Sequence, residues 1–192
     1  MKRIGLTGGI GSGKSMVAEL LQLFGIPVYN SDFQSKQLCE RHPVLVAGLT
    51  QLLGEGIYNS NGKLNRSLMA ELLFSNKQLL EACNSLIHPI VAQDFIEWSQ
   101  RQQAAFVVQE SAILFEAKLD NLFDVLVCVT APEDVRIERV CSRSGMSVEL
   151  VKSRMSNQWP EAEKIKRSNF ILVNDGQTPL IPQVELLLKR LC

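Results

Sequence analysis

Residues 8–15 read Gly-Gly-Ile-Gly-Ser-Gly-Lys-Ser, and this stretch decides the fold of the 192-residue chain. It fits the pattern G-x-x-x-x-G-K-[ST], in which a glycine-rich turn surrounds phosphate groups with backbone N–H groups. Residues 4–6, Ile-Gly-Leu, come before it and are typical of a buried strand. Residues 14–24 follow it with a helical pattern that Gly25 ends. A strand, a turn and a helix in this order predict a nucleotide-binding loop.

Each residue type in this loop has a physical role in binding a polyphosphate. Glycines allow positive φ angles and let backbone N–H groups approach phosphate oxygens. The N-terminus of the following helix adds partial positive charge. Lys14 supplies a full charge to the β- and γ-phosphates, and the Ser15 hydroxyl is a ligand for Mg²⁺. We therefore expect the nucleotide to be bound by Gly9, Ile10, Gly11, Ser12, Gly13, Lys14, Ser15 and Met16.

Four more short apolar runs predict further strands, at residues 27–29, 106–108, 125–129 and 170–173. Continuous apolar runs suit strands that are covered on both faces. The expected helices lie at residues 14–24, 65–75, 77–102 (broken near Pro89), 132–143, 147–157 and 179–191. Strands that alternate with helices predict a parallel sheet with right-handed crossovers. The predicted fold class is α/β, a three-layer fold of the P-loop NTPase type with a five-stranded parallel sheet.

The spacing of these elements predicts three regions. The second and third strands are about 75 residues apart, too far for a single crossover. We predict a helical insertion at residues 42–102 and a small helical lid at residues 138–158. The nucleotide-binding core then consists of residues 1–41, 103–137 and 159–192.

Composition excludes several classes of protein. The chain is 46% hydrophobic and 21% charged, which excludes a disordered chain and a coiled coil. Twenty basic and twenty acidic residues give no net charge, so we expect neither a nucleic-acid partner nor a membrane-surface partner. The sequence holds no apolar stretch of about 18 residues, so we expect no membrane span. We expect a monomer or a weakly associating homo-oligomer.

The cysteines indicate a reducing compartment. Five are present, and no two of them form a Cys-x-x-Cys pair. A disulfide framework or a zinc site is therefore disfavoured. We expect reduced thiols and a cytoplasmic location.

Two carboxylates follow predicted strands. Asp32 comes after the second strand, where it could accept a proton from an attacking hydroxyl or hold Mg²⁺ through water. The alternative is that Asp32 caps a helix that begins near Phe33. Glu110 ends the third strand, as a carboxylate that directs Mg²⁺ would. The alternative for Glu110 is a salt bridge in a loop.

Three arginines share one face of a predicted helix, since Arg136, Arg139 and Arg143 are spaced i, i+3 and i+7. Arg154 lies on the next helix. Near a γ-phosphate these arginines would neutralise transition-state charge and close as a lid. The alternative is a solvated face, which the nearby Glu133, Asp134 and Glu138 favour.

Residues after the second strand offer weaker signals for an acceptor site. His88 precedes Pro89 in a helical pattern, and most such histidines are structural. Arg66 could bind a phosphate of the acceptor or be solvated. Residues 111–116, which include Leu114, are unusually apolar for a loop and could wall an acceptor pocket or simply pack.

The loop alone identifies a nucleotide binder and no reaction. A guanine reader of the form Asn-Lys-x-Asp is absent, because Asn76-Lys77 is followed by Gln78-Leu79. The long helical insertion and the arginine-rich helices favour a small-molecule kinase. A kinase for another small acceptor, such as a nucleoside or a sugar, and a non-catalytic nucleotide switch remain the alternatives.

The chain resembles the dephospho-coenzyme A kinase family nearly end to end. The lead-in Leu-Thr-Gly-Gly-Ile of residues 6–10 is more specific than the general loop pattern. The order and spacing of the later matches carry the rest of the resemblance. These matches are Asp32, Gly62-x-Leu64-x-Arg66, Ile87-His88-Pro89, residues 111–116, Ala131-Pro132, Arg139 with Arg143, Arg154 through Gln158, and Asn174-Asp175-Gly176.

The resemblance implies ATP, Mg²⁺ and dephospho-CoA as ligands, and phosphorylation of the ribose 3′-hydroxyl in the last step of coenzyme A synthesis. It implies that the insertion at residues 42–102 binds CoA. Asp32 would be the base, and Lys14 and Arg139 would complete the catalytic set. Arg143 would bind ATP, and Ser15 and Glu110 would bind the metal. The acceptor would be bound by Thr7, Asp32, Arg66, His88, Leu114 and Arg139.

One departure from the family concerns the metal site. The family usually has Asp-x-Asp at the end of the second strand, and this chain has Asn30-Ser31-Asp32. An asparagine can hydrogen-bond a metal-bound water but brings no negative charge. If the first carboxylate normally helps to hold Mg²⁺, Glu110 or Asp32 must carry more of that role.

Overall fold

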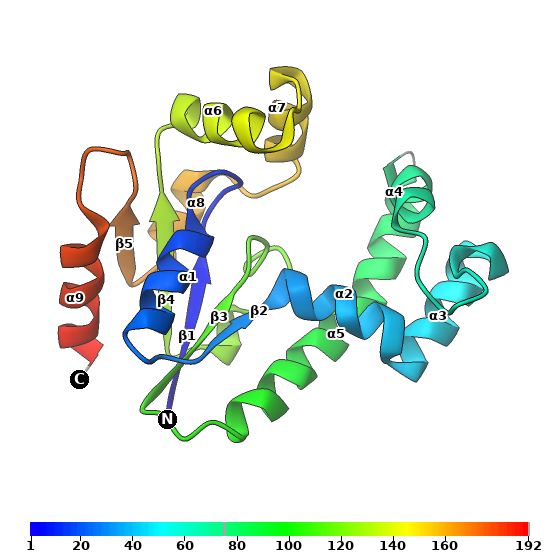
Figure 1. The fold of residues 1–192 in the computed structure, drawn as a ribbon, viewed down its shortest axis with the longest axis horizontal. Helices are drawn as coiled ribbons and strands as arrows, with labels where there is room; N and C mark the ends of the chain where they lie inside the picture. Colours follow the sequence, from blue (N-terminus) through cyan, green and yellow to red (C-terminus); the bar gives the residue numbers. More distant parts are fainter. Residues whose placement is uncertain (75, 192) are drawn as a thin grey trace. The chain divides into compact units, whose positions relative to one another are not determined.

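The computed structural model describes residues 1–74 and 76–191. Within them, five strands form one parallel sheet in the order β2-β3-β1-β4-β5 (Figure 1). The strands are β1 (Lys2–Thr7), β2 (Val28–Asn30), β3 (Phe106–Glu110), β4 (Val125–Thr130) and β5 (Phe170–Val173). Each strand lies at a predicted apolar run, so the predicted five-stranded parallel sheet is confirmed.

One face of the sheet is covered by α1 (Lys14–Leu23) and α9 (Leu180–Leu191). Ile4 and Leu6 of the central strand belong to the same buried cluster as Leu21 of α1 and Leu187 of α9. Because alternate residues of a strand point to opposite faces, Gly5 faces the other side. The arrangement places the start of α1 at the carboxyl end of β1.

The opposite face is covered by the loop after β3 and by α8 (Glu161–Lys166), which packs on β4. Leu114 and Phe123 occupy the space that a side chain at Gly5 would need. This loop contains the short 3-10 helix η2 (Asp120–Leu122). Helices and loops on both faces make the predicted three-layer architecture. No helix was predicted at α8, because six residues are too few to show a helical period.

Two more helices of this part, α6 (Glu133–Ser144) and α7 (Val148–Ser156), pack on each other. Gly145 ends α6 in the left-handed conformation, with φ of 68°. The predicted lid at residues 138–158 covers most of this helical pair. The pair belongs to the same compact unit as the sheet, and its motion as a lid remains a prediction.

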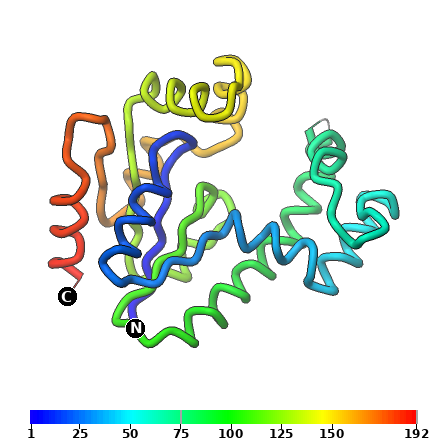
Figure 2. The backbone as a smooth tube through the Cα atoms, in the orientation of Figure 1, coloured from blue at the N-terminus to red at the C-terminus, as the bar shows by residue number. Residues whose placement is uncertain are grey.

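The chain divides into two compact units, one of Met1–Asn30 with Gln102–Cys192 and one of Ser31–Arg101. Figure 2 follows the backbone out of the first unit after β2 and back into it before β3. The second unit begins eleven residues before the predicted boundary at residue 42, because α2 packs on α3 and α5. We predicted α2 as part of the core, and the structure groups it with the helical insertion.

The second unit is helical in its described residues. It contains α2 (Ser31–Arg41), α3 (Pro43–Leu53), η1 (Glu55–Ile57), α4 (Arg66–Phe74) and α5 (Lys77–Gln100). Its buried apolar residues include Leu45, Leu49, Ile57, Cys83 and Phe95. No helix was predicted from the sequence at α3. No helix within residues 1–74 and 76–191 is long and apolar enough to cross a membrane.

The predicted break near Pro89 was wrong, because α5 runs through this residue. Proline removes one helical hydrogen bond and crowds the preceding turn, which costs a helix about 3 kcal/mol. Ile87, Val91 and Phe95 lie on both sides of Pro89 and are buried in the helical unit. Their packing offsets the local cost, so tertiary contacts override the local signal.

Candidate nucleotide-binding site

The loop of residues 8–13 leads from β1 into α1 at the carboxyl edge of the sheet. Gly13 caps α1 in the left-handed conformation, with φ of 89°, and offers no side chain to the helix. The leading N–H groups of α1 are therefore left to an acceptor from outside the helix. The loop has the geometry that an anionic phosphate chain requires.

Gly13 must be glycine for a second reason. A side chain at this position would meet the amide nitrogen of Asn174, which follows β5. The Asn174 Nδ2 donates to the Ser12 carbonyl over 2.9 Å, and its backbone N–H donates to Thr130 over 2.8 Å. Asn174 is buried. It therefore fixes the loop to the ends of β4 and β5.

Lys14 is 91% buried even though it carries a full charge. Its Nζ donates to the Gly9 carbonyl over 3.1 Å, so the ammonium group lies across the loop rather than in solvent. Burial of a charge is costly unless the charge has partners. Lys14 thus lies at the loop, and its contact with the phosphates stays a prediction.

Glu110 lies at the carboxyl end of β3 and is only 8% exposed. Its Oε1 accepts from the Ser15 hydroxyl over 2.9 Å. Its Oε2 accepts from Asn30 Nδ2 over 2.8 Å, and the register pairs Asn30 with Glu110 across adjacent strands. The two predicted metal-binding side chains, Ser15 and Glu110, are therefore in direct contact.

The three arginines predicted on one helix face differ in their burial and in their contacts. Arg139 Nη1 donates to the Asn174 carbonyl over 2.8 Å, so it lies at the loop that supports Ser12 and Gly13. Arg136 is buried, and its guanidinium lies against Gly9 and 3.6 Å from Glu161. Arg143 is exposed in the last turn of α6 and makes no hydrogen bond or ion pair with the described residues.

Three more residues of the unit that contains the sheet were predicted to bind the acceptor or the nucleotide, and they differ in exposure to solvent. Thr7 is fully buried at the end of β1, and within the described residues its hydroxyl has no hydrogen-bond partner. Leu114 is also fully buried, against Gly5. Met16 is exposed on α1. Thr7 and Leu114 are thus packed in the interior, and their contact with an acceptor remains a prediction.

The remaining predicted residues belong to the helical unit. Asp32 is exposed in the first turn of α2, which begins at Ser31, so the alternative that Asp32 caps this helix was wrong. Arg66 begins α4 and pairs with Glu40 of α2 over 2.9 Å. His88 lies half-buried on α5, and burial lowers the pKa of its imidazole.

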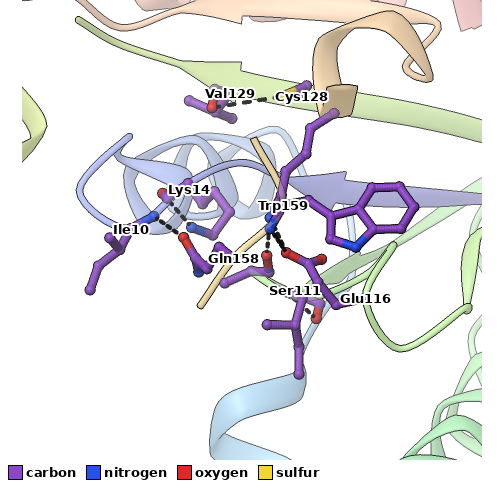
Figure 3. A network of polar contacts seen from close by, with 12 residues as sticks. Ile10, Lys14, Ser111, Glu116, Cys128, Val129, Gln158 and Trp159 are labelled. Atoms are coloured by element: carbon purple, nitrogen blue, oxygen red, sulfur yellow. Dashed lines mark hydrogen bonds and ion pairs between the residues drawn. The ribbon is translucent and has the colours of Figure 1, made fainter. Parts of the chain in front are cut away.

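Four cysteines of the described residues are free thiols, namely Cys39, Cys83, Cys128 and Cys141. Cys128 lies on β4, behind the loop, with its Sγ 3.9 Å from the Val129 carbonyl (Figure 3). Burial raises the pKa of Cys128 to about 11. The thiol is therefore protonated at neutral pH and is a poor nucleophile.

Comparisons with known proteins identify the family. The family model described as dephospho-CoA kinase matches residues 2–179. The chain belongs to the dephospho-CoA kinase family. A protein named dephospho-CoA kinase from Bacteroides fragilis is 42% identical over 183 residues, which are 95% of this chain and 89% of that protein. One of the same name from Porphyromonas gingivalis is 42% identical over 185 residues, 96% of this chain and 91% of that protein.

Solved structures agree with this dephospho-CoA kinase fold. A crystal structure from Thermus thermophilus has a TM-score of 0.84 at 36% identity, with 98% of this chain and 95% of that chain covered. The dephospho-CoA kinase from Campylobacter jejuni has a TM-score of 0.69 at 21% identity, with 98% and 94% covered. At that identity the second likeness concerns the fold alone.

Two residues that contact the loop, Asn174 and Gln158, had no role predicted from the sequence. Asn174 and Gln158 were quoted only as parts of the family's pattern, since neither side chain carries charge or nucleophilic chemistry. The structure places both on the loop, with Gln158 Oε1 accepting from the Ile10 N–H over 2.9 Å. Their sequence distance from the loop, about 150 residues, left no local signal.

Proposed function

We propose that the chain transfers the terminal phosphoryl group of ATP to the ribose 3′-hydroxyl of dephospho-CoA, giving coenzyme A and ADP. One observation carries the proposal. The phosphate loop, with Lys14 across it and the Ser15–Glu110 pair beside it, occurs in a chain that the dephospho-CoA kinase model matches over residues 2–179. The family gives the acceptor, and the loop gives the phosphoryl donor.

The side chains at the sheet edge fit Mg²⁺. Ser15 offers a hydroxyl oxygen and Glu110 a buried carboxylate, 2.9 Å apart. Mg²⁺ prefers hard oxygen ligands and usually takes one or two protein groups together with phosphates and waters. Ser15 and Glu110 would hold the ion, which would neutralise charge on the outer phosphates. Asn30 donates to Glu110, which orients the carboxylate and adds no charge of its own.

Asp32 is the proposed base. It is an exposed carboxylate in the first turn of α2, two residues after Asn30 ends β2. A carboxylate there can take the proton of the ribose hydroxyl as the hydroxyl attacks the γ-phosphorus. Phosphoryl transfer passes through a loose transition state, so positioning contributes more to the rate than early proton removal.

Lys14 and Arg139 are proposed to stabilise the charge that moves onto the transferring oxygens. Preorganised cations of this kind act strongly where water is excluded. Arg66 and His88 are proposed to bind the acceptor from the helical unit, and Arg143 to bind the nucleotide after the helical pair moves as a lid. The free thiols support a reducing compartment, and we propose the cytoplasm. We also propose a monomer or a weak homo-oligomer.

The test is steady-state ADP production with purified protein, ATP and Mg²⁺. We expect release of ADP that depends on dephospho-CoA, and little release with water, a nucleoside or a sugar as the acceptor. ADP release at the same rate with every acceptor, or with none, would contradict the proposed function. Omission of Mg²⁺ from the same assay tests the metal.

A further inference from the structure

Gln158 follows α7 in the chain. Its side chain lies at the beginning of the phosphate loop, next to residues 9 and 10. The Ile10 N–H donates to Gln158 Oε1 over 2.9 Å. Since a backbone N–H can only donate, the oxygen must face the loop and the Nε2 group must point elsewhere. Within residues 1–74 and 76–191, that Nε2 group has no hydrogen-bond partner.

The position of Lys14 indicates which phosphate of the nucleotide would lie at the beginning of the loop, next to residues 9 and 10. The lysine of such a loop reaches the β- and γ-phosphates, while the N–H groups at the start of the helix surround the inner ones. The Lys14 Nζ donates to the carbonyl of Gly9. The next residue, Ile10, donates its N–H to Gln158 Oε1, so Lys14 and Gln158 both lie at the beginning of the loop. Figure 3 shows the Lys14 and Gln158 side chains at the same part of the loop.

The space beside Gln158 is open to a ligand. A cavity of about 710 Å³ lies next to the loop, and its lining includes Gly9, Arg136, Lys152 and Gln158. The Arg136 Nε is buried and has no partner within the described residues. The same cavity is also lined by Glu133 and Glu161, so a phosphate there would lie among donors from Arg136, Lys152 and Gln158 and near two carboxylates.

We propose that Gln158 is a specificity residue for the terminal phosphate, with its Nε2 donating to the γ-phosphate while the Ile10 N–H holds its Oε1. The inference rests on the proposed function and deepens it. It assigns the recognition of a triphosphate over a diphosphate to a side chain outside the loop. An anchored amide suits this role, because its donor is oriented before the nucleotide arrives.

Glu116 and Lys164 are the positioning residues for Gln158. Glu116 Oε1 accepts from the Trp159 backbone N–H over 2.8 Å and from Lys164 Nζ over 2.7 Å. Lys164 is completely buried and also donates to the Ala112 carbonyl over 2.7 Å. In Figure 3, Glu116 lies beside Trp159, next to Gln158 in the chain. The contacts of the partly buried Glu116 with Trp159 and with the buried Lys164 fix the backbone that carries Gln158.

The Trp159 ring also holds the backbone beside Gln158 in place. It stacks on Phe115 with ring centroids 5.9 Å apart and an interplanar angle of 8°. The Arg167 guanidinium lies 4.9 Å from the Trp159 ring centroid. Phe115 is buried, so the stacking holds residue 159 against the loop that follows β3. The backbone beside Gln158 is therefore held by an ion pair and an aromatic stack.

The experiment measures the dissociation constants of Mg·ATP and Mg·ADP by calorimetry, without an acceptor. Gln158→Met keeps the side-chain length but removes both the acceptor and the donor. Gln158→Glu keeps an oxygen for Ile10 and replaces the donor with a negative charge. We expect ATP affinity to fall about tenfold or more in Gln158→Met, the size of one hydrogen bond to a charged group. We expect a larger fall in ATP affinity in Gln158→Glu. The ADP affinity should stay unchanged in Gln158→Met and should fall less than the ATP affinity in Gln158→Glu, because the added charge also repels ADP from further away.

A matched control is Gln22→Met, an exposed glutamine of α1 that should bind both nucleotides as the wild type does. Equal losses of affinity for ATP and ADP, or no loss of affinity for either, would overturn the proposal. A gain in ATP affinity would also overturn it, because it would show that the amide competes with phosphate for the Ile10 N–H. Glu116→Gln should lower the ATP preference as well as stability, and an unchanged preference would remove its positioning role. Wild-type protein without acceptor-dependent ADP release would instead contradict the proposed function.

Discussion

The phosphate loop and the helical unit Ser31–Arg101 differ in how their sequences specify them. The loop depends on polar contacts between distant residues, such as Asn174 with Ser12 and Glu110 with Ser15. The helical unit depends on apolar packing, and its proposed functional residues Asp32 and Arg66 are exposed. The loop still carries its phosphate-binding pattern in residues 8–15, whereas His88 of the helical unit gains a proposed role mainly from the resemblance to the family.

The largest expected effect concerns the loop. Lys14→Met should lower kcat by about 10²–10³-fold, because it removes a preorganised charge at the transferring phosphoryl group. The measurement is the initial rate of dephospho-CoA-dependent ADP release. Lys189→Met removes an exposed lysine of α9 and should leave the rate unchanged. A Lys14→Met enzyme with the wild-type rate would contradict the placement of the phosphates.

The second effect concerns the helical unit. Asp32→Asn should lower kcat by on the order of 10²-fold, since general base catalysis typically contributes at least this much. The ATP dissociation constant should stay the same, because Asp32 is not part of the loop. Turnover and calorimetry check the two parts separately. Glu55→Gln, an exposed carboxylate of the same unit, is the matched control, and full turnover in Asp32→Asn would exclude this residue from the chemistry.

A smaller effect is expected at the edge of the sheet. Asn30→Asp replaces a donor with a second carboxylate beside the buried Glu110. Without metal, we expect stability to fall by about 1–3 kcal/mol, the cost of leaving a buried polar group unsatisfied. Mg²⁺ should restore stability more in the variant than in the wild type, because two carboxylates attract the ion more strongly.

Urea unfolding of Asn30→Asp and the wild type, with and without Mg²⁺, measures both differences. An equal gain from Mg²⁺ in the two proteins would show that the ion does not bind at Glu110. The result also tests whether Asn30, at the end of β2, limits the affinity of this edge of the sheet for Mg²⁺.

The smallest effect concerns His88 on α5. Burial lowers the pKa of this imidazole, so the unfolded chain binds its proton more readily than the folded chain. The contribution of His88 to stability is therefore complete above the unfolded pKa of about 6.5 and is lost as pH falls toward the folded pKa. His88→Gln should flatten the stability profile in that window. Parallel profiles for variant and wild type would contradict the burial effect.

The sequence predicted the sheet well because each strand is a short apolar run bounded by polar residues. Residues 125–129 and 170–173, for example, correspond to β4 and β5. It predicted α5 less well. The destabilisation of a helix by Pro89 is visible in the local sequence, whereas the tertiary packing that offsets it is not. The sequence placed the domain boundary at residue 42, because the contacts that join α2 to α3 and α5 are tertiary.

The candidate site could be predicted as far as its chemistry is local. Residues 8–15 carry the phosphate-binding pattern themselves, and Glu110 was found because it ends a strand. Gln158 and Asn174 could not be assigned, since an amide side chain gains a role only from what it contacts. Thr7 and Leu114 were predicted from the family, and the structure buries both in the interior.

The most direct test of the central claim is ³¹P NMR of the product formed from ATP, Mg²⁺ and dephospho-CoA. We predict a new phosphate monoester on the ribose 3′-oxygen, formed in step with ADP and absent in Lys14→Met. Free inorganic phosphate in place of the monoester would contradict phosphoryl transfer to this acceptor. A monoester that forms equally well in Lys14→Met would contradict the role of the loop.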